Sequence, residues 1–124
     1  SFKNLLNCCY RNKFSDASFS YIVDFSGSEL AGLIALKNKS HLYHLFVATA
    51  FQRQGLSRQL WRFALQNTAL PHSKNIVFTV NSSLYAQAVY EKLGFKASGI
   101  AVESNGIIFT PMDLELKCKN TDQR

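Results

Sequence analysis

The segment from His44 to Trp61 constrains the fold most, because it has the pattern of a strand, a tight loop and a helix in immediate succession. Residues 45–47 form an apolar, partly β-branched run typical of a buried strand. From Leu56 the apolar residues recur at helical spacing, at positions 56, 60, 63 and 64. We therefore predict a helix over residues 56–68. Its solvated face should carry Arg58, Arg62 and Gln66.

The loop before this helix favours a bound anion. The first backbone N–H groups of a helix have no partner within it, and the helix dipole makes that end positive. Gly55 lets the backbone approach a ligand oxygen, while Arg53 and Arg58 add positive charge. No Lys-Ser/Thr pair follows the glycine, and the three-glycine dinucleotide pattern is absent. The loop therefore predicts a diphosphate site rather than a triphosphate P-loop.

Four stretches of the sequence, the loop among them, carry a family resemblance. The loop Gln52-Arg-Gln-Gly55-Leu-Ser57 resembles the acetyl-CoA loop of the GNAT superfamily of N-acetyltransferases, Gln/Arg-x-x-Gly-x-Gly/Ala, with Ser57 at its last position. Phe78-Thr-Val-Asn81 and Tyr90-Glu-Lys-Leu-Gly94-Phe95 are similar to the superfamily's next strand and helix. The segment from Ser104 to Met112 is similar to the tail of one bacterial branch. The resemblance covers residues 21–116.

The expected fold is a mixed, mostly antiparallel α/β sheet with helices on both faces. Its two central strands, residues 41–47 and 76–80, should run parallel, because a helix crosses between them, and should splay apart near Val47. We expect one acetyltransferase domain over residues 1–124, without the superfamily's usual first strand and helix. The other expected elements are strands at 18–25, 30–36, 95–102 and 107–116 and a short helix at 2–11. A further helix, capped by Ser82 or Ser83, should carry Ala86, Val89, Tyr90 and Leu93 on one face and stop at Gly94.

Acetyl transfer to an amine needs a base. An amine with a lysine-like pKa near 10.4 is neutral at pH 7 in only about one molecule in two thousand. His41, Tyr43 and His44 are the candidates, acting directly or through a water, and strand alternation predicts 41, 43, 45 and 47 on one face with 44 on the other. The resemblance favours His41, although His41 starting a strand at the surface explains its position equally well. His44 is better explained as a structural histidine of the sheet.

The resemblance also implies the remaining site residues. Tyr90 corresponds to a tyrosine that protonates the CoA thiolate, although an aromatic residue on a buried helix face is the structural alternative. The Leu45 N–H would bind the thioester oxygen, and the Phe46 and Val47 backbone would pair with the pantetheine arm. The full cofactor-binding set is Leu45, Phe46, Val47, Gln52, Arg53, Gln54, Gly55, Leu56, Ser57, Arg58 and Asn81.

Composition limits the other functions. The chain has 124 residues and a net charge of +6, with 47% hydrophobic residues and no apolar run near the roughly 20 residues of a membrane span. We expect a cytoplasmic protein with reduced cysteines, no membrane partner and no metal. The sequence is also compatible with a homodimer. The sequence has no basic stretch interleaved with aromatic residues, which is the pattern expected of a nucleic-acid-binding surface. A nucleic-acid-binding module is therefore the weakest alternative.

Two functions of different class remain compatible with the sequence. The first is an acetyl-CoA-dependent N-acetyltransferase that moves the acetyl group directly to a primary amine of a small molecule or peptide. The second is a non-catalytic acyl-CoA-binding or regulatory module of the same fold. None of the three cysteines lies in the motif blocks, which argues against a cysteine nucleophile.

Overall fold

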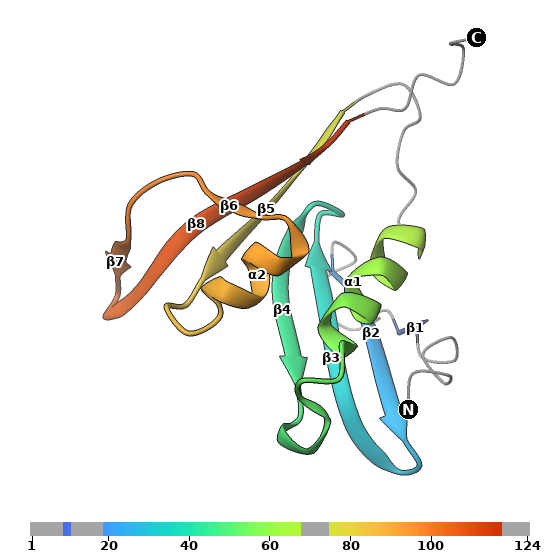
Figure 1. Ribbon diagram of the computed structural model, residues 1–124. Helices are drawn as coiled ribbons and strands as arrows, with labels where there is room; N and C mark the ends of the chain where they lie inside the picture. Colours follow the sequence, from blue (N-terminus) through green and yellow to red (C-terminus); the bar gives the residue numbers. More distant parts are fainter. Residues whose placement is uncertain (1–8, 11–18, 68–74, 118–124) are drawn as a thin grey trace, which may run out of the picture. The chain divides into compact units, whose positions relative to one another are not determined.

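The computed structural model of the protein describes residues 9–10, 19–67 and 75–117 (Figure 1). The chain divides into two compact units, Ser1–Thr68 and Ala69–Arg124. Three predicted features depend on how the two units join: the parallel pairing of residues 41–47 with 76–80, the splay near Val47, and the placement of helices on both faces of the sheet. These features and the single domain therefore remain predictions.

The first unit is built on antiparallel hairpins. Its strands are β1 (Cys9–Tyr10), β2 (Phe19–Ser26), β3 (Glu29–Lys37) and β4 (His41–Val47), each antiparallel to the next. The expected helix at 2–11 is wrong at Cys9 and Tyr10, which pair with Ile22 and Tyr21 of β2 instead. Backbone pairing to an edge strand outweighs the helical spacing there; residues 2–8 lie outside the described part.

A β-bulge in β4 changes which side chains share a face. Ala35 of β3 pairs with His44, whereas the next residue, Leu36, pairs with Leu42, so Tyr43 is an extra residue. Directly paired residues place their side chains on the same face of a sheet. Because Lys37 pairs with His41, His41 and His44 lie on one face. The predicted alternation, with His44 opposite His41, is therefore wrong.

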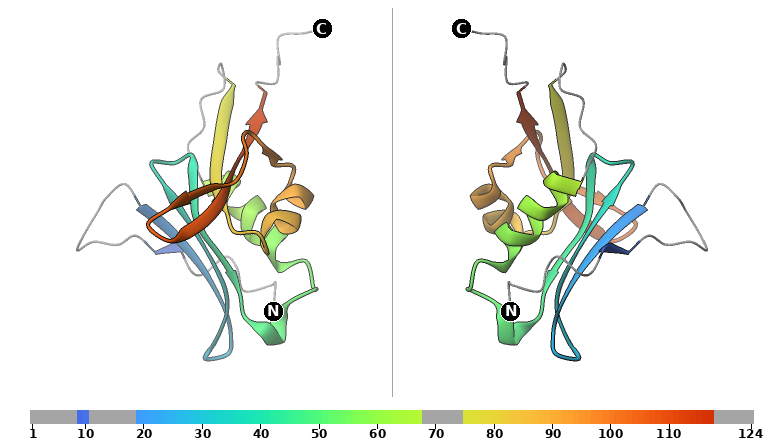
Figure 2. Two further views of the ribbon diagram at one scale, coloured as in Figure 1. Left: turned by 90° about the vertical axis from the view of Figure 1, so that its left-hand side faces the viewer. Right: turned by 90° about the vertical axis from the view of Figure 1, so that its right-hand side faces the viewer.

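Helix α1 (Leu56–Asn67) covers the other face of this sheet (Figure 2). A Cβ placed on Gly32 of β3 would lie 3.0 Å from both Leu56 Cδ2 and Leu60 Cδ1, so the glycine allows the helix to approach closely. The expected apolar stripe is confirmed at 56, 60 and 64, whereas Phe63 is only half-buried. The core of this unit is Ile22, Ile34, Leu36, Leu42, Leu56, Leu60, Trp61 and Ala64.

The second unit is organised around one long strand. Strand β8 (Ile107–Leu116) pairs antiparallel with β5 (Ile76–Ser82), β6 (Lys96–Ala97) and β7 (Val102–Ser104). The Asn105-Gly106 turn joins β7 and β8 as expected, with φ values of 53° and 80°. The core consists of Phe78, Val80, Tyr90, Phe95 and Met112, with the buried Ser82 beside it.

The expected strand over 95–102 is interrupted. The Ser98 N–H donates to the Pro111 carbonyl at 2.9 Å, but a proline has no N–H to return a bond. Pairing stops there and resumes at Val102, and Ile100 between the two short strands is 85% exposed.

Helix α2 (Gln87–Leu93) begins later than the serines predict. Ser82 ends β5, and the Ser83 carbonyl and hydroxyl both accept from the Ala86 N–H, at 3.3 and 3.2 Å. Ala86 is the N-cap, and no side chain caps the helix, so the serine cap is wrong. Tyr90 is buried as expected, but Val89 is 38% exposed. The stop at Gly94 is confirmed by its φ of 107°.

Candidate functional site

The chain from β4 to α1 forms a closed loop. A 3-10 turn, Thr49–Phe51, follows the strand, and the Ala48 N–H extends the β3 pairing by donating to the Ala31 carbonyl at 2.8 Å. The Gln52 side chain donates to the Val47 carbonyl at 3.0 Å, and the Gln54 side chain to the Ala50 carbonyl at 3.3 Å. Two of the predicted ligand residues therefore hold the loop together with their side-chain amides.

Helix α1 starts with its backbone donors accessible. Arg53 and Gly55 have left-handed φ values of 63° and 80°, and a Cβ on Gly55 would meet nothing within 4 Å. The Gln59 N–H makes the first helical bond, to the Gly55 carbonyl at 3.1 Å. Within the described chain, no group accepts from the N–H groups of residues 56–58, which precede that bond. This end of the helix can therefore donate to an anion.

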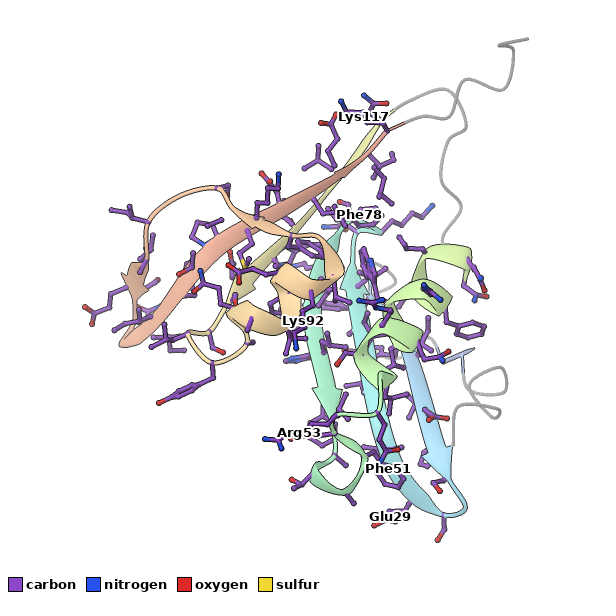
Figure 3. The ribbon with its side chains drawn as sticks, viewed as in Figure 1. Glu29, Phe51, Arg53, Phe78, Lys92 and Lys117 are labelled. Carbon is purple, nitrogen blue, oxygen red and sulfur yellow. The ribbon has the colours of Figure 1, made fainter. Side chains whose placement is uncertain are left out.

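Charge around the helix start is positive. Arg53 and Arg58 are exposed, and Arg53 projects outward from the loop (Figure 3). No acidic residue lies in the first turn of α1. Ser57 is half-buried, and none of the described groups hydrogen-bonds its hydroxyl. A phosphate oxygen at this end would meet backbone donors and two mobile guanidinium groups without a competing carboxylate in that turn.

The base candidates lie on the face of the sheet opposite α1. His41 is half-buried, and its pKa lies below the usual value, first because of burial and second because of the nearby Lys37 charge. His41 is therefore neutral at pH 7 and able to accept a proton. Tyr43, at the bulge, is 49% exposed, and its ring meets that of His44 edge to face, with centroids 4.5 Å apart.

The strand residues predicted to bind the thioester oxygen and the pantetheine arm place their side chains on different faces of the sheet. Leu45 and Val47 pair with Ile34 and Gly32 on the α1 face, whereas Phe46 pairs with Leu33 on the opposite face and is 46% exposed. All three contribute backbone to the end of β4 that leads into the loop.

Two predicted residues belong to the second unit. Tyr90 is 7% exposed, and its ring meets Phe95 edge to face at 5.8 Å. Burial raises the pKa of Tyr90, so the phenol is protonated at pH 7. Asn81 is exposed on β5, paired with Pro111.

Lys37 was not predicted from the sequence. It is the direct partner of His41, and its Nζ lies 5.5 Å from the centroid of the Phe19 ring. The sequence signal was available, because a hairpin turn at Asn38 and Lys39 brings the two residues opposite each other. In the described ranges, no cluster of three or more His, Cys, Asp or Glu side chains could hold a metal ion, and no helix is long and apolar enough to span a membrane.

The fold and the site together define a class. An α/β protein with a mostly antiparallel sheet, in which a strand passes through an open glycine loop into a helix, offers a backbone site for an anionic ligand. Residues 1–116 match the family described as an acetyltransferase (GNAT) domain, so this chain belongs to the GNAT family of acetyltransferases.

Solved structures share the fold at low sequence identity. A GCN5-related N-acetyltransferase from Rhodopseudomonas palustris is 22% identical with a TM-score of 0.62, and the match covers 79% of this chain and 62% of that one. An acetyltransferase from Bacillus subtilis, solved in complex with CoA, is 19% identical with a TM-score of 0.55, covering 80% and 78% of the two chains. ElaA from Escherichia coli is 17% identical with a TM-score of 0.61, covering 87% and 78%. The chain thus spans less than two thirds of the Rhodopseudomonas protein, and no curated protein matches it.

Proposed function

We propose that the protein is an acetyl-CoA-dependent N-acetyltransferase that transfers an acetyl group directly to a primary amine. The observation that carries this proposal is the start of α1. There the left-handed Gly55 leaves open space, the N–H groups of residues 56–58 precede the first helical bond, and Arg53 lies close by. Family membership supports the same conclusion, because the match to an acetyltransferase (GNAT) domain over residues 1–116 includes the motif that resembles the acetyl-CoA loop.

Recognition of the cofactor would come mainly from backbone. The N–H groups of Leu56, Ser57 and Arg58 would donate to the diphosphate oxygens, with the Arg53 and Arg58 guanidinium groups adding charge. The Ser57 hydroxyl is available as a further donor. Gln52 and Gln54 would act indirectly, because their side chains hold the loop carbonyls. The backbone of Leu45, Phe46 and Val47 would bind the thioester oxygen and the pantetheine arm, and Asn81 would complete the binding set.

In the reaction, the amine nitrogen forms a bond to the thioester carbonyl carbon, and the carbon–sulfur bond breaks with its electron pair going to sulfur. His41 would accept the proton of the incoming ammonium, which its neutral state at pH 7 allows. Tyr90 would donate its proton to the departing thiolate and be reprotonated by the second proton that the nitrogen loses as the amide forms. The raised pKa of Tyr90 makes this transfer harder, unless the thiolate is also held in a dry environment that raises its own proton affinity.

The first experiment separates binding from turnover. The thermal midpoint is measured with acetyl-CoA, with ATP and NAD as controls, and CoA release is then followed over a panel of amines. Ligand at a hundred times its dissociation constant should stabilise the protein by about 2.7 kcal/mol. We expect a shift with acetyl-CoA alone, and CoA release only when an amine is present.

Variants then test the roles. His41→Gln should lower kcat/KM by about 10²- to 10⁴-fold without changing acetyl-CoA affinity. Tyr90→Phe should lower kcat with little loss of binding. Binding of acetyl-CoA without turnover of any amine would support the non-catalytic module instead. Unchanged turnover in both His41→Gln and Tyr90→Phe would refute the assigned roles.

A further inference from the structure

The face of the first-unit sheet opposite α1 carries a row of rings on two strands. Phe19 and Tyr21 of β2 are stacked with centroids 6.1 Å apart, and Phe19 meets Tyr43 of β4 edge to face at 5.0 Å. Tyr43 in turn meets His44 at 4.5 Å. We call Phe19, Tyr21, Tyr43 and His44 the aromatic face. Because Tyr43 and His44 are exposed, it is a surface that an apolar group can contact.

A positive charge, that of Lys37, lies at the edge of this surface. Lys37 extends over the Phe19 ring, with Nζ 5.5 Å from its centroid, and is paired across the sheet with His41. Within residues 19–67 and 75–117, no carboxylate forms an ion pair with Lys37. The lysine charge also reaches the imidazole, since it contributes to the lowered pKa of His41. The proposed base, a cation and an aromatic surface therefore occupy one face.

We propose that the acetyl acceptor is a free amino acid with an aromatic or large apolar side chain, whose carboxylate binds Lys37 and whose amine is presented to His41. This inference rests on the proposed function and names its substrate class. The side chain of the acceptor would lie on the aromatic face, beside Phe19 and Tyr43.

The geometry suits an amine and a carboxylate on the same carbon. Directly paired residues in an antiparallel sheet have Cβ atoms about 4.5–5.5 Å apart, so Lys37 and His41 rise from neighbouring positions of one face. The Lys37 ammonium leans toward Phe19, which leaves room for a carboxylate beside it. The amine nitrogen and carboxylate oxygens of an amino acid are only about 2.5–3.5 Å apart. An amine that lacks the carboxylate would instead bring its ammonium close to the Lys37 charge with nothing to offset the repulsion.

The acceptor nitrogen must lose a proton before it can attack, and His41 is the group proposed to take it. The nitrogen of the amino acid forms the amide bond to the acetyl carbon, and the sulfur leaves with the electron pair of the broken bond. The nitrogen loses two protons in all: the ammonium gives one to His41, and a second leaves as the amide forms. This second proton replaces the one that Tyr90 delivers to the thiolate, and the products are an N-acetyl amino acid and CoA.

The test compares acceptors that differ only in the carboxylate. L-Phenylalanine is paired with 2-phenylethylamine and L-leucine with 3-methylbutylamine, and kcat/KM is measured for the wild type, Lys37→Met and Lys39→Met. Lys39, in the adjacent turn, is the matched control because its loss changes the net charge equally. We expect the wild type and Lys39→Met to prefer the amino acids at least tenfold. In Lys37→Met this preference should disappear through a rise in KM for the amino acids.

Taking the ratio of kcat/KM between the two members of a pair cancels any effect of Lys37 on the basicity of His41, because that effect is the same for both acceptors. An equal loss for both members of a pair in Lys37→Met would overturn the inference, as would a wild type that acetylates the amines as well as the amino acids. Both of these results leave the proposed function standing. Failure to bind acetyl-CoA, by contrast, would refute the proposed function itself.

Tyr43→Ala tests the aromatic face. It should lower kcat/KM for L-phenylalanine more than for glycine, and an equal loss for both acceptors would remove the aromatic face from the proposal.

Discussion

The two helices of the described chain differ in how they are anchored and how they begin. Helix α1 buries Leu56, Leu60, Trp61 and Ala64, whereas the shorter α2 buries Tyr90 alone. Helix α1 follows a left-handed glycine with open space around it, whereas α2 follows a turn in which Ser83 occupies the Ala86 N–H. A firmly held helix with an accessible start is suited to binding an anion at a fixed position, and only α1 combines the two properties.

The largest expected effect concerns the anchoring. Leu60→Ala removes a fully buried side chain that packs against Gly32, and should cost about 2–5 kcal/mol of unfolding free energy. Leu93→Ala, the same substitution at a half-buried position of α2, should cost less than half as much. Urea denaturation monitored by circular dichroism measures both. Equal costs would mean that the two helices are anchored alike.

A second prediction concerns the buried polar groups of the two units. The Ser82 hydroxyl donates to the Ser83 carbonyl at 2.7 Å, whereas both oxygens of the fully buried Asp24 lack a hydrogen-bond partner among the described residues. Burying a charged carboxylate without a partner costs more than burying a neutral amide of the same shape, so Asp24→Asn should stabilise the protein by about 1–3 kcal/mol at pH 7.

The pH dependence of this effect has a definite sign. Burial raises the pKa of Asp24 above its usual value of 3.8. The carboxyl is therefore neutral, and its contribution to stability fully present, below pH 3.8; that contribution is lost as the pH rises through the folded-state value. The stability gain of Asp24→Asn should accordingly appear as the pH rises and vanish in acid. A gain independent of pH would exclude the ionised carboxylate as its cause.

A third prediction separates binding from backbone strain. Gly55 and Gly27 both have left-handed φ values, 80° and 63°, with nothing within 4 Å of an added Cβ. Alanine at either position should cost about 1–2 kcal/mol of stability, because the left-handed region is unfavourable for residues with a Cβ. Only Gly55→Ala should also weaken acetyl-CoA binding, measured by isothermal titration calorimetry. Similar affinities in the two variants would show that the Gly55 backbone does not contact the ligand.

The smallest expected effect concerns the serines near the helix starts. Ser83→Ala should cost about 0.5–1 kcal/mol, because the Ala86 N–H loses its side-chain acceptor. Ser57→Ala should leave stability unchanged within about 0.5 kcal/mol but alter acetyl-CoA affinity, since no described group hydrogen-bonds its hydroxyl. Thermal and chemical denaturation measure the stability of both variants, and a titration with acetyl-CoA measures their affinity.

The elements that the sequence predicted well are those fixed by local signals. The bounds of β4 and the start of α1 follow from an apolar run, a glycine and helical periodicity, and Gly94 ends α2 through its own backbone conformation. The bulge at Tyr43 was not predictable in this way, because it depends on the register with β3. The interruption after Ala97 has a similar cause in the partner strand, where Pro111 lacks a donor. The burial of Asp24 was not predicted either, because nothing in its alternating strand marks it as a buried position. Its burial depends on packing with the rest of the unit.

Prediction of the candidate site was limited in the same way. The loop residues 52–58 were identified from the motif and lie together in one unit. Lys37 was missed because its importance comes from its cross-strand partner, His41, and not from its sequence neighbours. The face shared by His41 and His44 was predicted wrongly for the same reason, since one extra residue in a strand reverses the alternation beyond it.

Binding of the acetyl-CoA diphosphate at the start of α1 can be tested residue by residue. The ¹⁵N-labelled protein is titrated with acetyl-CoA and monitored through its backbone amide resonances. We predict that the amides of residues 53–58 shift most and that those of residues 87–89, at the start of α2, shift less. Saturable binding that leaves the amides of residues 53–58 unmoved would contradict the claim.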